Sequence, residues 1–225
     1  MRSMISVAVV AAVSGSALAD GGDYGLWTQN GKVQTAIGDH TDQVLFGFGE
    51  RVFAADMLGS VATGWEADEP GIFIPEASLP DNTAVGFNIL GNLLYWDGTG
   101  PVSAVDASVA MTLRFGPESR VTPGDASTVA GFTINYDADA VGGFDEHYDY
   151  LLGAGAAEGI YFLQNSFTLS GFQESRSVWT VFNAGLTELE HDAAIEYAET
   201  VLVPAPGAAG VLAMAGLIGA RRRRS

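Results

Sequence analysis

The sequence predicts a mainly β fold, an antiparallel β-sandwich or jelly roll with one late helix. Apolar and polar residues alternate along several short segments, which is the pattern of half-buried strands. Gly, Pro, Asp and Asn separate these segments at short intervals, which indicates turns between neighbouring strands. No linker-like stretch interrupts residues 20–203. We therefore expect a single acidic β-sandwich domain there, long enough to bury a sizeable core.

The clearest strand spans residues 105–115. Its odd-numbered positions are all apolar, whereas Asp106, Ser108, Thr112 and Arg114 stand between them, a period of two. Aromatic and β-branched residues also favour strands in other segments. These five further predicted strands are 43–53, 84–90, 129–136, 159–169 and 177–183.

One helix is predicted at about 188–199. Thr187 and Glu190 have the spacing of a capping box, in which each residue satisfies a free backbone N–H of the first turn. Leu189, Ala193 and Tyr197 fall on one face of this helix, so that face is expected to be its apolar side.

Composition limits the partners of the domain. Outside the terminal segments the chain has five basic residues and all 27 acidic residues, a formal charge of −22 for residues 20–203. Such a field repels nucleic acid and anionic lipid and favours cations, cationic polymers or simple solubility. Because the chain has no Cys, the hydrophobic core must hold the fold without disulfides.

Residues 1–19 have the pattern of a secretory signal peptide with a short apolar helix. Arg2 gives a basic start, residues 5–13 form an apolar stretch, and Ala17 and Ala19 fit the small-x-small rule for cleavage. We expect export, with signal peptidase cutting after Ala19.

The C-terminal segment, residues 204–225, follows a different pattern. Fourteen small apolar residues, 207–220, precede Arg221–Arg224. They predict an apolar helix, shorter than the roughly 20 residues that usually span a membrane. Four arginines tend to stay on the cytoplasmic side, which favours a transient anchor in the inner membrane. A buried core helix is the alternative interpretation.

This tail resembles the PEP-CTERM sorting signal, with Pro-Ala-Pro in place of Pro-Glu-Pro. The resemblance implies that an exosortase-type transpeptidase cuts near the Pro motif and passes the protein to the cell surface or extracellular matrix. Phrases within 86–98 and 179–186 also resemble uncharacterised exported proteins with this type of tail. The residues that carry the sorting resemblance are Val203, Pro204, Ala205, Pro206, Arg221, Arg222, Arg223 and Arg224.

The acidic segment 135–146 is the candidate metal site, with calcium as the only cofactor considered. Asn135, Asp137 and Asp139 occupy the first, third and fifth positions of a calcium loop, and Glu146 the twelfth, next to Asp145. Ala140 stands where such a loop has Gly, and the flanking patterns are β rather than helical, which excludes an EF-hand. A turn between two strands explains the same composition.

Two tryptophans, Trp65 beside the acidic run 66–69 and Trp96 beside Asp97, suggest a sugar-binding face. Aromatic rings stack on sugars while carboxylates bind hydroxyls, and extracellular polysaccharide would then be a partner. Buried core aromatics are the alternative interpretation.

Three histidines, His40, His147 and His191, each adjoin acidic residues. Their spacing places no two ligands on one helix face, so they are interpreted as surface residues with raised proton affinity rather than a metal site.

No nucleophile elbow, Cys or phosphate loop occurs in the chain. The sequence therefore predicts an exported, non-catalytic protein with a structural or binding role. A secreted carbohydrate-active enzyme and a calcium-dependent lectin-like binder are the alternatives.

Overall fold

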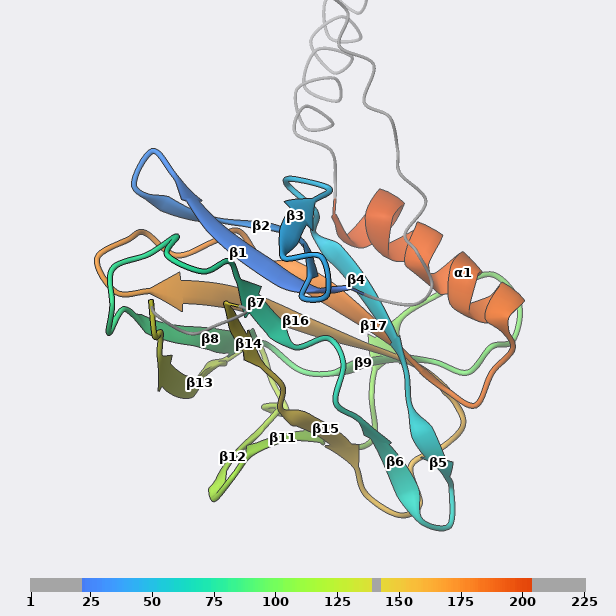
Figure 1. The fold of residues 1–225 in the computed structure, drawn as a ribbon. Helices are drawn as coiled ribbons and strands as arrows, with labels where there is room; N and C mark the ends of the chain where they lie inside the picture. The colour runs from blue at the N-terminus through green and yellow to red at the C-terminus, as the bar shows by residue number, and fades with distance from the viewer. Residues whose placement is uncertain (1–21, 139–142, 204–225) are drawn as a thin grey trace, which may run out of the picture.

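Seventeen strands in three sheets and one late α-helix make up the described part of the computed structural model, residues 22–138 and 143–203 (Figure 1). The prediction of a mainly β, sandwich-like fold with a late helix is confirmed for these residues. The signal helix, the C-terminal apolar helix, the cleavage residues Ala17 and Ala19, and the sorting residues from Pro204 onward lie outside them.

The first sheet contains five strands and begins with a hairpin. Asn30 and Gly31 both have positive φ and close the hairpin between β1 and β2, as Asn-Gly turns do. On its other side β1 pairs with β7 in parallel. In spatial order the strands are β14 (Phe144–Glu146), β7 (Ile72–Ile74), β1 (Asp23–Gln29), β2 (Lys32–Asp39) and β3 (Val44–Phe46).

The second sheet contains seven strands around the long central β16. One edge of β16 pairs with β17 along 159–165, and the other edge pairs with β9 and then β8. β4 joins β17 in parallel. The sandwich is thus mixed, not purely antiparallel, because two of its pairings are parallel. The strands are β10 (Val105–Asp106), β9 (Leu94–Trp96), β16 (Gly159–Leu169), β17 (Val178–Ala184), β4 (Val52–Asp56), β8 (Ala84–Leu90) and β13 (Thr128–Asn135).

The third sheet contains five short strands joined antiparallel. In spatial order they are β12 (Glu118–Val121), β11 (Met111–Phe115), β15 (Asp149–Leu152), β6 (Gly64–Ala67) and β5 (Leu58–Ser60).

The central strands of the second sheet, β16 and β17, are buried on both faces. Every residue of β17 is buried, and successive side chains of a strand point to opposite faces. Phe182 therefore packs into the core shared with the first and third sheets, whereas Trp179 and Val181 pack into a second core under the helix. This division places a sheet layer on one side of β16–β17 and the helix on the other (Figure 1).

Helix α1 (Glu188–Tyr197) continues as a π-helical turn, η1 (Ala198–Leu202). The predicted capping pair is present, because the backbone N–H of Thr187 donates to the Glu190 carboxylate at 2.8 Å. The predicted apolar face was wrong at Leu189, which is 79% exposed, whereas Tyr197 is partly buried against the second core. The face turned to the sheet carries His191, Ala194, Ile195 and Ala198.

Two predicted strands are each divided between sheets. Residues 105–106 belong to the second sheet and 111–115 to the third, since period-two patterning is the same whichever sheet a strand joins. Residues 44–46 and 52–56 belong to the first and second sheets. Gly47 and Gly49, both with positive φ, turn the chain between them.

The helices of the described residues are short. None of them is both long enough and apolar enough to cross a bilayer.

Docking of α1 gives a matched pair of stability predictions. Ile195 is 4% exposed and Leu189 is 79% exposed on the same helix. Ile195→Ala should lower the free energy of unfolding by about 2 to 4 kcal/mol because it opens a cavity in the second core. Leu189→Ala should change it by less than about 0.5 kcal/mol. Urea denaturation of both variants measures this, and equal effects would contradict the observed orientation of the helix.

Candidate functional site

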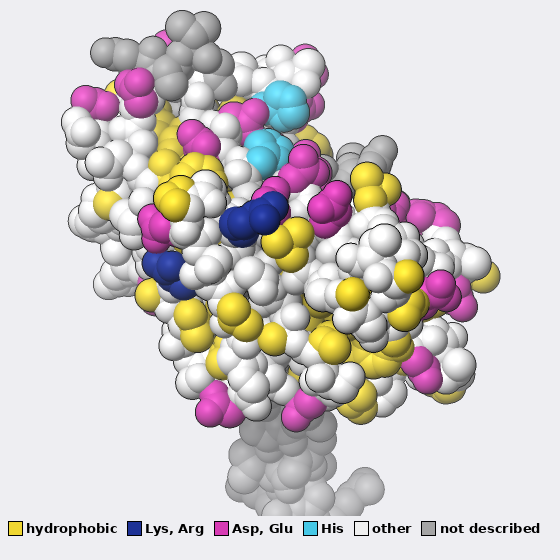
Figure 2. All heavy atoms as spheres, turned by 90° about the horizontal axis from the view of Figure 1, so that it is seen from below, with side chains coloured by type: hydrophobic (Ala, Val, Ile, Leu, Met, Phe, Trp, Pro, Cys, Tyr) yellow, Lys and Arg dark blue, Asp and Glu magenta, His cyan; other side chains and the backbone are white. Residues whose placement is uncertain are grey.

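Histidine and acidic side chains gather on one face of the molecule (Figure 2). Two groups of possible metal-ligating side chains share Asp23: one adds His40 and Asp145, and the other adds Glu69 and His147. Within each group the ligand atoms lie within 4.8 Å of one another. We call these five residues the Asp23 cluster.

The topology of the first sheet assembles this cluster. β1 and β7 are parallel, so the start of β1 at Asp23 lies beside the start of β7, just after Glu69. β2 and β14 run antiparallel to them, so both strands end at the same edge of the sheet, immediately before His40 and His147. Residues from four distant segments therefore meet at one end of one sheet.

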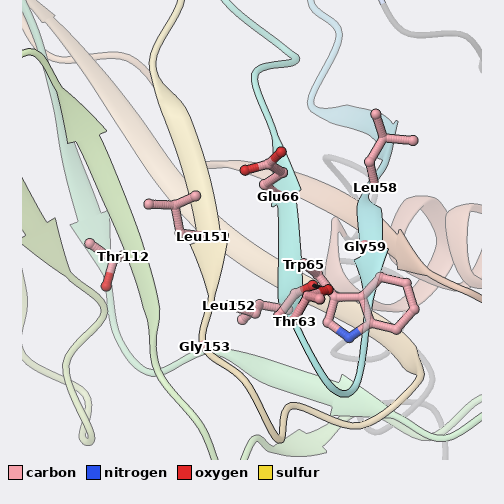
Figure 3. A pocket seen from close by; sticks show the side chains of 10 residues that line it. Leu58, Gly59, Thr63, Trp65, Glu66, Thr112, Leu151, Leu152 and Gly153 are labelled. Carbon is pink, nitrogen blue, oxygen red and sulfur yellow. Dashed lines mark hydrogen bonds between the residues drawn. The ribbon is translucent and has the colours of Figure 1, made fainter.

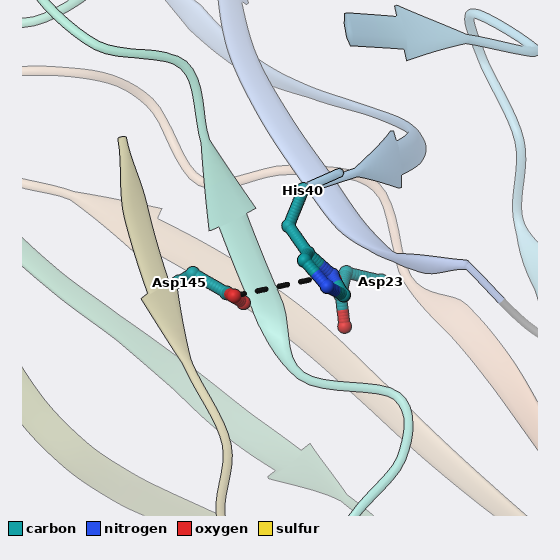
Figure 4. A group of neighbouring side chains, drawn as sticks. All are labelled: Asp23, His40 and Asp145. Carbon is teal, nitrogen blue, oxygen red and sulfur yellow. Dashed lines mark ion pairs between the residues drawn. The ribbon is translucent and has the colours of Figure 1, made fainter. Parts of the chain in front are cut away.

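Four of these side chains form a closed ring of nitrogen–oxygen contacts. His40 Nδ1 lies 3.5 Å from Asp23 Oδ2 and 3.9 Å from Asp145 Oδ2. His147 Nε2 lies 3.1 Å from Asp145 Oδ1 and 3.9 Å from Asp23 Oδ1. Each imidazole thus faces both carboxylates, and Figure 4 shows His40 between Asp23 and Asp145.

Asp23 is the buried member of the ring, with a side chain that is 4% exposed. Its Oδ1 accepts a hydrogen bond from the backbone N–H of Gly71 at 2.9 Å. A Cβ at Gly71 would lie 2.9 Å from the His147 ring and 3.0 Å from Asp23 Oδ1. Only glycine therefore lets the backbone approach these two side chains so closely.

His147 is oriented by its other ring nitrogen. Nδ1 lies 3.1 Å from the carbonyl oxygen of Asp68 and 3.6 Å from Glu69 Oε1. Because a carbonyl oxygen can only accept, Nδ1 carries the proton and donates it. In the protonated ring Nε2–H also donates to Asp145 Oδ1 at 3.1 Å, whereas in the neutral ring the lone pair of Nε2 faces Asp145 and Asp23.

The cluster shifts the protonation of Glu69 and His147. Burial, followed by repulsion from Asp23, raises the pKa of Glu69 to about 7. Burial by itself would lower the pKa of His147. The nearby carboxylates of Glu69, Asp23 and Asp145 and the Asp68 carbonyl stabilise the protonated ring more strongly, so the pKa of His147 is raised. The raised proton affinity expected of the histidines is thus found at His147.

The proposed calcium segment contributes one residue to the cluster, Asp145. Asn135 ends β13 and is exposed, Asp137 follows it, and Asp139 lies outside the described residues. Glu146 ends β14, and burial, followed by repulsion from Asp145, raises its pKa. Pairing of β14 with β7 instead directs Asp145 to the histidines.

The surface interpretation of the histidines was wrong for His191. This residue lies on the face of α1 that is turned to the sheet, and its side chain is fully buried. Nε2 donates to the Val181 carbonyl oxygen at 3.1 Å. Docking of the helix, which no local pattern specifies, covers this ring. His40 remains about half exposed, at 52%.

Trp65 and Trp96, the candidate sugar-binding aromatics, are each only 5% exposed. They pack into different cores, Trp65 with the first and third sheets and Trp96 under the helix. The two rings therefore form no shared exposed face.

A pocket of about 450 Å³ lies over the third sheet, beside Trp65 (Figure 3). Thr112, Leu151, Glu66 and Leu58 stand opposite one another on successive strands β11, β15, β6 and β5. Among the residues that line this pocket, Glu66 is the one with a carboxylate.

Local sequence patterns did not predict that Asp23 is a site residue, or that Glu69 lies beside His147. The Asn30-Gly31 dipeptide was the available signal, because such a hairpin turn pairs 23–29 with 32–39. That register sets Asp23 opposite Gly38, two residues before His40.

Loss of Glu69 should flatten the pH dependence of stability. The pKa of Glu69 is about 7 in the folded protein, against an ordinary 4.5. Its protonation therefore contributes stability that is fully present below pH 4.5 and is lost as the pH rises through 7. His147, also with a raised pKa, acts in the same direction. With chelator present, the melting temperature of the wild type should therefore fall over this range more steeply than that of Glu69→Gln.

The matched control is Glu66→Gln, an exposed carboxylate on β6, which should follow the wild-type curve. Parallel curves for wild type and Glu69→Gln would show that Glu69 does not titrate as described.

Comparison of the chain with models of known protein families and with curated proteins found no match. The resemblance to PEP-CTERM proteins therefore rests on the residues quoted for it, and the chemistry of the Asp23 cluster rests on its own geometry.

Proposed function

We propose that the protein is exported and held at the cell surface or in the extracellular matrix, where its acidic β domain has a non-catalytic structural or binding role. An exosortase-type enzyme would recognise the tail after signal peptidase removes residues 1–19. This proposal rests on the order of the segments: a signal-like start, a β fold, and a Pro-flanked apolar tail that contains Arg221–Arg224.

The end of the described fold supports this proposal. Leu202 and Val203 are partly buried against the core beneath α1, so packing extends to the residue before Pro204. The late helix is docked on the sheet through Ala194 and Ile195 rather than standing away from it as a stalk. The sorting motif would then begin where the domain ends.

Charge also supports an extracellular role. With a formal charge of −22 on residues 20–203, the domain would stay soluble and repel anionic lipid after release from the membrane. The same charge argues against nucleic acid as a partner.

A carbohydrate-binding role on a jelly-roll scaffold is the second candidate, favoured by the pocket on the third sheet. Thr63, Glu66 and Thr112 offer polar groups there beside Leu58 and Leu151. Binding pockets combine apolar walls with a few polar groups in this way. A glycan array probed with and without calcium tests it: signal abolished by Glu66→Gln would support this role, and an array without signal would remove it.

Mass spectrometry of surface-recovered protein tests the sorting proposal. The full chain, expressed in a host with an exosortase, should yield a mature form that begins at Asp20 and lacks Arg221–Arg224. The same chain in a host without the enzyme should keep the arginines, as should a Pro204→Ala, Pro206→Ala variant. Intact arginines on material recovered from the surface of the first host would refute sorting by cleavage.

A further inference from the structure

We propose that Asp23, His40, Asp145 and His147 form a binding site for one divalent first-row transition metal ion, with Zn²⁺ as the representative. The site goes beyond the proposed function and does not depend on how the protein is sorted. Its ligands would be His40 Nδ1, His147 Nε2 and the carboxylates of Asp23 and Asp145, each of which turns one oxygen to each imidazole.

The geometry of the ring matches such an ion. A tetrahedral zinc site with bonds of about 2.0–2.1 Å places neighbouring ligand atoms roughly 3.3 Å apart. The four contacts around the ring are 3.1, 3.5, 3.9 and 3.9 Å. Small rotations of His40, which is 52% exposed, would shorten its own contacts of 3.5 and 3.9 Å with Asp23 and Asp145. The other 3.9 Å contact joins His147 to Asp23 and does not depend on His40.

The burial of Asp23 supplies an independent reason for a cation. A buried carboxylate is costly unless a positive charge or hydrogen bonds compensate it. Among the described residues, the ion-pair partners of Asp23 are His40 and His147, which are cations only when protonated. With neutral imidazoles, the ring holds two carboxylates, and a divalent ion would balance their charge.

The surroundings of the ring resemble those of known metal ligands. A ligating histidine commonly donates its other ring N–H to a carbonyl or carboxylate, which fixes the tautomer and the ring. His147 Nδ1 has both partners, the Asp68 carbonyl and Glu69. The N–H of Gly71 fixes Asp23 in the same way.

The donor set selects the class of metal. Two imidazole nitrogens with carboxylate oxygens suit zinc and its first-row neighbours. Calcium and magnesium prefer oxygen ligands alone, so they should bind this ring weakly. The exposure of His40 leaves the ring accessible to ions from solvent.

Isothermal titration of ZnCl₂ into the untagged full-length chain, purified in mild detergent after chelator treatment, tests the proposal. The wild type should bind one equivalent. His147→Gln and His40→Gln should each weaken binding by about tenfold or more, since loss of a supporting group alone costs that much. Circular dichroism and a melting curve establish that each variant is folded.

Two controls lie close to the ring. Asp42→Asn changes an exposed acid in the turn that carries His40, and Asp137→Asn changes an acid of the calcium segment. Both should leave zinc affinity within twofold of the wild type. Asp23→Asn should abolish binding, but because Asp23 is buried the histidine variants carry the conclusion.

Zinc affinity that is unchanged in both histidine variants would overturn the site, as would no zinc binding by the folded wild type. Zinc binding lost in Asp137→Asn but not in His147→Gln would overturn it in favour of the 135–146 segment. Failure of zinc binding would leave tail processing, measured by mass spectrometry, unaffected, so the two proposals fail separately.

Discussion

Burial of β16 and β17 on both faces is the constraint on which the rest of the structure depends. Alternate side chains of these strands enter two separate cores, so each face must be covered by another layer. The first and third sheets cover one face, and α1 covers the other. Without disulfides, this layering supplies the apolar burial that holds the domain together.

Parallel pairing of β1 with β7 brings the residues of the Asp23 cluster together. It aligns the starts of these strands with the ends of β2 and β14, and polar residues within or just beyond these strand ends meet there. Beneath them, buried tyrosines continue the polar contacts: Tyr150 donates to the Pro70 carbonyl oxygen at 2.9 Å, and its hydroxyl oxygen lies 3.2 Å from that of Tyr24. The cluster is thus anchored to the core rather than scattered over the surface.

A metal ion at this place would connect segments that are far apart in sequence. Asp23 begins the described strands, His40 follows β2, and Asp145 and His147 lie more than 100 residues later. An ion held by all four would constrain the unfolded chain as a disulfide does. The strongly acidic domain would also attract such cations from its surroundings.

The sequence by itself determined a mainly β, sandwich-like fold with a late helix, the capping pair at Thr187 and Glu190, and β8 and β16 with the bounds that were predicted. These features depend on local patterns: alternation, turn residues and cap spacing. Only the tertiary structure decided where one patterned run changes sheet, which face of α1 is buried, and that His191 is covered while His40 and His147 meet. The physical reason is that the alternation of apolar and polar residues does not depend on which strand is the partner. The Asp23 cluster forms through pairing between distant segments, which local patterns do not specify.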